Sequence, residues 1–232
     1  MPSLDSKYHF YVIHQRPFQD KKIILTLFVR GLGKVQVVHQ IYSVKKSLQL
    51  QPMREYCGVL KQGKGMYKLS QVEQVSFTHP PDYLCQLSVL YLNELIYWLL
   101  PEDMDSLLYD YYGHFLSTLE RQTLSLQLRH FEVRMLEALG YSILSRVDGN
   151  DQPINADTYY LYVPQKAFVK VSPCDHAYSG ALIVKMSQGV EHWCGDTLKM
   201  IKAITRLQID ACLEGRVLHS RQLLLDYLAL RG

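Results

Sequence analysis

Five short apolar segments, each closed by turn-forming residues, occupy the N-terminal third of the chain and limit how it can fold. The segments run over Tyr8–His14, Lys22–Arg30, Lys34–Tyr42, Met53–Leu60 and Met66–Gln74. The residues between them include Arg16-Pro17, Gly31-Leu32-Gly33, Gln51-Pro52 and Gly63-Lys64-Gly65, which favour turns. Polar and apolar residues alternate over residues 34–37, as is typical of a strand with one buried face. Five consecutive short strands predict a small closed or sandwiched β unit.

Basic residues are concentrated in this β unit. Residues 1–78 contain 12 Lys and Arg against 4 Asp and Glu, a net charge of +8. The whole chain carries +3, so the remainder carries −5. A basic β unit joined to a mildly acidic remainder indicates that the N-terminal part binds a polyanionic partner and that the C-terminal part makes other contacts.

Composition places the chain among globular proteins with a full hydrophobic core. Of its 232 residues, 48% are hydrophobic and 20% charged, and no apolar run reaches the roughly 18 residues of a membrane span. The first five residues lack the pattern of a secretory signal. Five scattered cysteines contain no C-x-x-C pair, so we expect reduced thiols, without disulfides or structural zinc, and a cytoplasmic location.

The hydrophobic period changes at His79-Pro80-Pro81, where we place a boundary between domains 1–79 and 80–232. Asp82 is the expected N-cap of a helix that begins at Tyr83 and stops at Pro101. Apolar stripes at helical spacing predict two more helices, one over residues 108–119 and one over 124–139 that ends at Gly140. We interpret these stripes as core rather than as a ligand-binding site.

The final third mixes a hairpin with further helices. Residues 158–163 and 167–171 are expected to pair as a hairpin insertion at about 157–172, followed by a short helix over 178–188. Asp196 is predicted to cap a long helix that ends near Gly215, and Ser220 to cap the last helix. The long helix is expected to bury Leu198, Ile201, Ile204, Leu207 and Ile209. The fold class is therefore α+β, an N-terminal β barrel followed by a mainly α-helical domain.

The sequence contains no convergent set of catalytic groups. Signatures of serine hydrolases, zinc peptidases and paired carboxylates are absent. His192 and Cys194 are two residues apart, but no further ligand lies near them. Arg129 is followed by Val133 and Leu136 on one helix face, which fits either an ordinary exposed arginine or a groove for a peptide with an acidic, hydrophobic end. We therefore expect a binding protein rather than an enzyme.

Several segments, taken in order, resemble the RecO family of bacterial recombination mediators. The first are Tyr11–Phe18, Leu27-Phe28 before Gly33-Lys34-Val35, and Leu50-Gln51-Pro52. Further along are Tyr91–Leu95, Leu128–Glu132 leading to Leu139-Gly140-Tyr141, Ala203–Arg206 and Leu218–Leu223. Their order and spacing cover nearly the whole chain.

The resemblance implies an N-terminal OB-fold and a helical C-terminal domain. It also implies binding of single- and double-stranded DNA, annealing of complementary strands, and contact with the acidic tail of single-strand binding protein. Action with RecR, and in some members RecF, to load RecA would place the protein at the nucleoid. Many members hold zinc with four cysteines after the Leu-Gly-Tyr segment; residues 142–150 contain no cysteine here, so we expect no metal, as in the zinc-less branch.

The resemblance and the charge pattern together give the expected site residues. An OB-fold with a positive groove binds phosphates without reading sequence. The expected DNA contacts are Lys21, Lys22, Arg30, Lys34, Lys45, Lys46, Lys64, Lys199, Lys202 and Arg206, with Arg216 extending the second row. The resemblance implies a site for the tail of single-strand binding protein at Arg129, Val133 and Leu136. Two alternatives stay open: an adaptor that binds only proteins, and a DNA-processing enzyme.

Overall fold

The structure is a computed structural model that describes residues 7–40, 49–63, 65–104 and 107–230. Its contacts divide the chain into two compact units. Unit 1 comprises Met1–Arg121 with Leu218–Gly232, and unit 2 comprises Gln122–Val217. By these contacts the β barrel shares its unit with three helices, whereas the boundary near residue 80 remains a prediction from the sequence.

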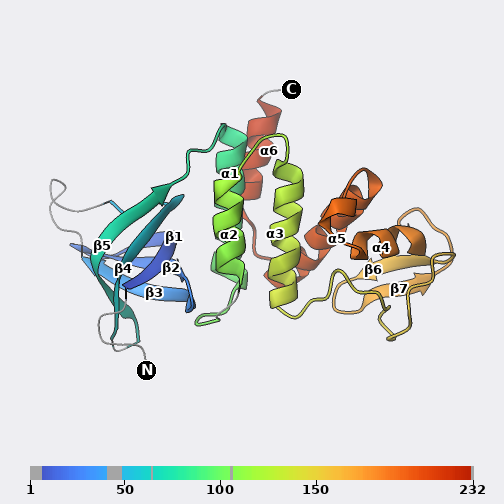
Figure 1. Cartoon of the computed structure of the whole chain (residues 1–232), viewed down its shortest axis with the longest axis horizontal. Coiled ribbons are helices and arrows are strands. Elements are labelled where there is room, and N and C mark those ends of the chain that lie inside the picture. Colours follow the sequence, from blue (N-terminus) through green and yellow to red (C-terminus); the bar gives the residue numbers. More distant parts are fainter. Residues whose placement is uncertain (1–6, 41–48, 64, 105–106, 231–232) are drawn as a thin grey trace. The chain divides into compact units, whose positions relative to one another are not determined.

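The barrel of unit 1 confirms the predicted OB-like β unit (Figure 1). Its strands are β1 (Lys7–Gln19), β2 (Lys22–Val29), β3 (Gly33–Gln40), β4 (Arg54–Gln62) and β5 (Tyr67–Phe77). They close in the order β1-β2-β3-β5-β4, antiparallel except for the parallel pair β3–β5. The interior is filled by wholly or almost wholly buried apolar side chains, including Phe10, Leu25, Leu27, Val37 and Tyr56. Alternate residues of each strand supply this core because successive side chains point to opposite faces.

Helices α1 (Tyr83–Leu99) and α2 (Leu108–Ser117) cover part of the outer barrel surface. The ring of Tyr11, which points outward from β1, lies 5.2 Å from the ring of Tyr109 and 5.0 Å from that of Tyr112. Asp82 caps α1 as predicted, because its carboxylate accepts a hydrogen bond of 2.8 Å from the backbone N–H of Cys85. The aromatic contacts therefore fix α2 on β1.

The last helix, α6 (His219–Ala229), returns to unit 1 and packs against α1. Ser220 was predicted to cap it, and that prediction is wrong. Leu218 holds the N-cap position without a side-chain hydrogen bond, and Ser220 lies inside the first turn. The carboxylate of Glu94, on α1, supplies the missing acceptor. The cap thus comes from a distant part of the chain.

Unit 2 combines three helices with a small antiparallel sheet. Its elements are α3 (Leu124–Ala138), β6 (Tyr159–Val163), β7 (Ala167–Val171), β8 (Tyr178–Ser179), α4 (Gly180–Ser187), the 3-10 turn η1 (Val190–His192) and α5 (Asp196–Leu213). The hairpin β6–β7 is confirmed, and β8 adds a third strand beside β6, so residues 178–179 are strand rather than helix. Within this unit, α3 and α4 both pack on α5.

Two sequence predictions for α5 are wrong. Asp196 is its first residue rather than its cap, Gly195 holds the N-cap position, and the Asp196 carboxylate pairs with Lys199 instead. Leu207, expected inside, is 47% exposed, whereas Thr205 and Gln208 are buried. Both polar side chains have buried hydrogen-bond partners, which is why the apolar stripe alone misplaced this face.

Two further findings concern metals and membranes. Across the described residues, no three His, Cys, Asp or Glu side chains gather as metal ligands would, and the five cysteines are free thiols. Among those same residues, no helix combines the length and apolarity that crossing a membrane requires.

Candidate nucleic-acid interface

Lys34 does not offer its charge to solvent, which corrects its prediction as a DNA contact. The residue is 8% exposed, and its Nζ donates a hydrogen bond of 2.7 Å to the backbone carbonyl of Tyr97. Burial lowers the pKa of its ammonium from 10.5. Alternation along β3 does turn Lys34 outward from the barrel, but α1 and the segment after it cover that position, where Asp103 donates its N–H to the Lys34 carbonyl. The strand pattern could not reveal this cover.

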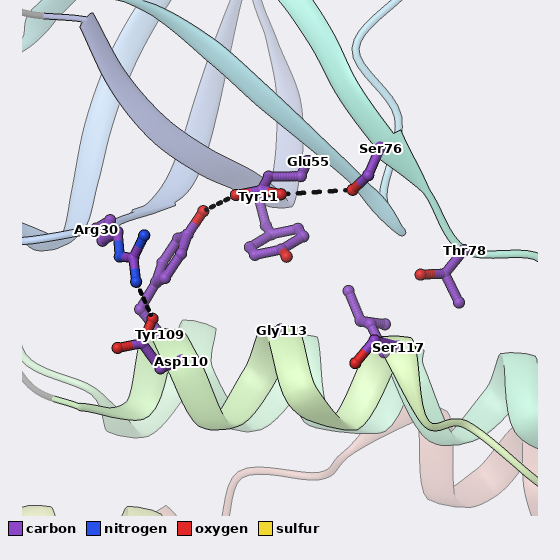
Figure 2. Close-up of a pocket in the computed structure, with 10 residues that line it drawn as sticks. Tyr11, Arg30, Glu55, Ser76, Thr78, Tyr109, Asp110, Gly113 and Ser117 are labelled. Atoms are coloured by element: carbon purple, nitrogen blue, oxygen red, sulfur yellow. Dashed lines mark hydrogen bonds and ion pairs between the residues drawn. The ribbon is translucent and has the colours of Figure 1, made fainter.

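Arg30 is exposed at the end of β2 but already has an acidic partner. Its Nη2 lies 2.9 Å from Oδ1 of Asp110, and its guanidinium lies 5.9 Å from the centre of the Tyr109 ring. The pair closes one side of a hollow of about 310 Å³ between the barrel and α2 (Figure 2). The charge of Arg30 is thereby largely offset for any phosphate nearby.

Glu55 makes the same hollow unfavourable for phosphate. Its Oε1 accepts a hydrogen bond of 3.0 Å from the hydroxyl of Tyr109 (Figure 2). The same oxygen lies 2.9 Å from Nδ1 of His9. Burial, reinforced by this carboxylate, raises the pKa of the Tyr109 hydroxyl far above 10, so the hydroxyl stays protonated and donates. The hollow therefore joins the barrel to α2 and places a carboxylate where a phosphate would have to bind.

The β1–β2 turn keeps two of the predicted cations accessible. Lys21 is exposed and Lys22 half-buried, and with Gln19 and Asp20 they line an open hollow at the tip of the turn. Ile23 packs against the barrel core, so its neighbour Lys22 points outward. Lys45, Lys46 and Lys64 lie outside the described residues.

Two lysines that sequence reasoning did not select stand side by side on the outer barrel surface. Lys61 of β4 and Lys68 of β5 are direct cross-strand partners, and both are exposed. Their neighbours Leu60 and Leu69 pack against the core, so both lysines point outward. Like charges directly opposite on a sheet are destabilising. The sequence signal was present, because the two lysines flank the glycine turn at 63–65, but the predicted strands stopped one residue short of Lys61.

Strand register relates these lysines to Lys22. Lys68 pairs with Val38 of β3, which pairs with Ile24 of β2, and Lys22 lies two residues from Ile24 on the same face. Neighbouring strands are about 4.8 Å apart, so Lys22 and Lys68 are separated laterally by about 10 Å. We call Lys22, Lys61 and Lys68 the lysine row. No ion pair found in the described part of the chain includes any of the three.

The second predicted row, on α5, is largely neutralised by its own helix. Lys199, Lys202 and Arg206 are all exposed and are spaced to share one face. However, Lys199 Nζ lies 2.9 Å from Asp196 Oδ1, and Arg206 Nε lies 3.8 Å from Asp210 Oδ2. Two of the three cations thus have carboxylates beside them, whereas no ion pair of Lys202 is found among the described residues.

Arg129 is buried in unit 2, with only 9% of the residue exposed. Its Nη2 lies 2.8 Å from Oε1 of Glu132, and the two side chains are 11% and 0% exposed. Its Nε is buried and has no hydrogen-bond partner within the described ranges of the chain. Val133 and Leu136, predicted to line a peptide groove beside it, are wholly buried in the core, so that part of the prediction is corrected. Helical spacing placed them near Arg129 but did not show that they face inward.

Comparison with known proteins identifies the family of this chain. The family model for the recombination protein O N terminal matches residues 1–77, and the model for its C terminal matches residues 80–221. The DNA repair protein RecO of Francisella tularensis subsp. novicida is 31% identical, over 97% of this chain and 98% of the relative. The RecO proteins of Tolumonas auensis (33% identical, 96% of both chains) and Pseudoalteromonas translucida (26% identical, 93% of this chain and 96% of the relative) are also similar. The chain therefore belongs to the RecO family of DNA repair proteins.

Proposed function

We propose that this protein binds single- and double-stranded DNA through the lysine row of its barrel and anneals complementary strands without catalysing bond cleavage. Its family gives it a role in DNA repair and recombination. The observation that carries the proposal is the direct pairing of Lys61 with Lys68, with Lys22 nearby and no acid in an ion pair with any of them among the described residues.

Electrostatics favours phosphate as the partner of this surface. Two ammonium groups on directly opposed positions repel each other, and a polyanion relieves that repulsion. Each phosphate contact releases condensed counterions, so affinity falls steeply as salt rises. The lysine side chains recognise charge and not base identity, so binding is independent of sequence.

Annealing requires that two strands of like charge be held side by side. A cationic barrel surface neutralises one strand, and Lys21 and Lys202, both exposed, are candidates to meet the other. Base pairing itself supplies the driving force, so the protein needs no nucleophile, metal or acid–base pair. This fits a sequence that contains none of the common catalytic signatures.

We further propose that the protein acts in a loading pathway, with RecR and in some settings RecF, which places RecA on DNA coated by single-strand binding protein. We propose Arg129 as the contact for the acidic tail of that protein, because a guanidinium can bind a carboxylate with two donors, although its side chain is 11% exposed and would first have to leave Glu132. The hydrophobic end of the tail would need a surface other than Val133 and Leu136.

Strand annealing by the pure protein tests the proposal. We expect complementary oligonucleotides to anneal faster with the protein than without it, and the acceleration to disappear as salt rises. Lys61→Glu combined with Lys68→Glu should abolish the acceleration, whereas Lys170→Glu, at an exposed lysine of unit 2, should retain it. Equal annealing by both variants would refute the role of the lysine row.

The alternative is an adaptor that binds only proteins, and it is favoured by the burial of Lys34 and the pairing of Arg30 with Asp110, which remove two expected DNA contacts. Under this alternative, Arg129→Ala weakens binding of a peptide with an acidic, hydrophobic end. The lysine-row variants would then leave all partner binding and any DNA affinity unchanged. Measuring both peptide and DNA affinity for both variants separates the two functions.

A further inference from the structure

A cation and two aromatic rings contact one another where β5 ends, with the cation over one ring and the second ring nearly perpendicular to the first. The guanidinium of Arg54 lies 4.2 Å from the centre of the Phe77 ring, and the ring of His79 lies 4.0 Å from that of Phe77 at an angle of 72°. Arg54 and Phe77 are cross-strand partners at the last position of the β4–β5 ladder. We call these three residues the terminal stack.

The terminal stack is held in place by the barrel on one side. Thr78 donates its backbone N–H to the carbonyl of Met53 at 3.0 Å, which extends the ladder one step past Phe77. Arg54 Nη1 donates a hydrogen bond of 2.6 Å to Oε1 of Gln74. Ser76 and Thr78 face the hollow beside α2 (Figure 2), so strand alternation turns Phe77 to the opposite side, away from that carboxylate-bearing hollow.

The other side of the terminal stack is open to solvent. Phe77 is 37% exposed and His79 is exposed, and the neighbouring Val75 is 49% exposed. A single exposed apolar residue is ordinary. Here, however, an exposed phenylalanine lies against a cation, next to a second exposed ring, and the buried Nε of that cation has no hydrogen-bond partner in the described part of the chain. Such an arrangement presents flat, rigid surfaces at little cost in side-chain entropy.

We propose that the terminal stack binds an unpaired nucleobase of single-stranded DNA by stacking the base on one of its exposed rings. This rests on the proposed DNA binding and adds a second kind of contact to it. Every base has a π-face, so the contact accepts any sequence. Bases inside a duplex are already stacked on their neighbours and cannot reach the rings without being unstacked. The terminal stack therefore favours a single strand over a duplex.

One strand of the sheet connects this site to the lysine row. Lys68 lies near the start of β5 and Phe77 at its end, a separation of at most about 30 Å along the strand at about 3.3 Å per residue. Lys61 and Lys68 lie on the outer face of this sheet, whereas Arg54 and Phe77 lie on the face that Tyr56 and Leu60 turn to the core, so a single strand must pass around the end of the barrel to reach both sites. Pairing with a complement withdraws the base from the rings, so the duplex product keeps only the charge contacts and leaves more readily.

The proposal is tested by measuring affinity for three ligands. They are an oligothymidylate, an oligonucleotide of the same length with an abasic sugar at every position, and a duplex. Phe77→Leu keeps an apolar side chain but removes the ring, and Phe77→Trp keeps a larger ring. We expect Phe77→Leu to weaken oligothymidylate binding by about tenfold, with the salt dependence unchanged, and to leave abasic and duplex binding as in the wild type. Phe77→Trp should bind oligothymidylate at least as well as the wild type.

The control is Tyr159→Leu, at an aromatic residue of unit 2 with a similar exposed fraction of 39%. It should bind all three ligands as the wild type does, and thermal unfolding of each variant checks that it folds. The proposal is overturned if Phe77→Leu binds oligothymidylate like the wild type, or if it weakens abasic binding equally. Either result leaves charge-based binding intact. By contrast, a wild-type DNA affinity that does not change with salt concentration would refute the proposed function itself.

Discussion

Glu94 of α1 caps α6 through Ser220, a residue 126 positions away in the sequence. One oxygen of the Glu94 carboxylate accepts hydrogen bonds from the backbone N–H of Ser220 at 2.9 Å and from its hydroxyl at 2.6 Å. The other accepts the backbone N–H of His219 at 2.8 Å. A negative charge beside exposed N–H groups is favourable at a helix N-terminus. This interaction ties the end of the chain to unit 1.

Replacing Glu94 with alanine should loosen α6. We expect Glu94→Ala to lower the free energy of unfolding of unit 1 by about 1–2 kcal/mol, the usual cost of removing a helix cap. Urea denaturation measures the change, and limited proteolysis should show earlier cleavage near residue 219. Glu120→Ala, at an exposed glutamate of the same unit, should leave both unchanged. Equal stability of Glu94→Ala and the wild type would contradict the capping role.

This cap marks a limit of local sequence rules. Ser220 and Asp196 both have the residue type of an N-cap, and both lie inside the first turn of their helices. For α6 the acceptor comes from another helix, and for α5 a glycine holds the N-cap position. By contrast Asp82, whose acceptor role is local, was predicted correctly.

Lys34 gives a second prediction, because its charge is buried. Lys34→Met should leave DNA affinity unchanged and alter stability at neutral pH by less than about 1 kcal/mol, since it removes one hydrogen bond but relieves a desolvated charge. Fluorescence anisotropy with labelled DNA measures the affinity, and Lys61→Met is the matched control that should weaken it. Reduced DNA affinity in Lys34→Met would show that this lysine reaches solvent.

Glu132 gives a third prediction, at the junction of α3 and α5. It is fully buried, pairs with Arg129 at 2.8 Å, and accepts a hydrogen bond of 2.7 Å from the Thr205 hydroxyl. Glu132→Ala leaves the Arg129 charge without this carboxylate and should cost about 3–5 kcal/mol of folding free energy in unit 2. Thr205→Val should cost about 1–2 kcal/mol.

Glu137→Ala provides the comparison for Glu132→Ala, because the Glu137–Arg134 pair on the same helix is partly exposed. Its removal should cost less than about 1 kcal/mol. Chemical denaturation of the three variants measures this order. Similar destabilisation by Glu132→Ala and Glu137→Ala would contradict a buried, structural role for Glu132.

His39 gives a prediction about pH. Burial lowers the pKa of its imidazole from 6.5, and its buried Nδ1 has no hydrogen-bond partner among the residues that the structure describes. Between the folded pKa and 6.5 the unfolded chain binds more protons than the folded one, so stability rises with pH across that window and then levels off. His14, whose pKa burial also lowers, adds to the same trend.

Urea midpoints at about pH 5 and about pH 8 test this effect. The wild type should be more stable at the higher pH, and His39→Gln should show a smaller difference between the two. His176→Gln, at an exposed histidine of unit 2, should keep the wild-type difference. A pH dependence that His39→Gln leaves intact would assign the effect to other groups.

The barrel was predictable from sequence, but which of its basic side chains are exposed and unpaired was not. Turn residues and alternation located all five strands, because both are local properties of the chain. Which lysines reach solvent depends on pairing register and on the helices that cover the barrel. Lys34 is buried under α1, Arg30 is paired with Asp110, and Lys61 meets Lys68 only after β4 and β5 align.

The salt dependence of single-strand binding tests the lysine row most directly. The wild-type affinity should fall linearly on a logarithmic salt scale, and Lys61→Gln with Lys68→Gln should reduce the slope by about 1.4, or about 0.7 for each phosphate that is no longer neutralised. Lys170→Gln should keep the full slope. An unchanged slope in the double variant, with the protein folded, would contradict the claim that the barrel holds DNA through these two lysines.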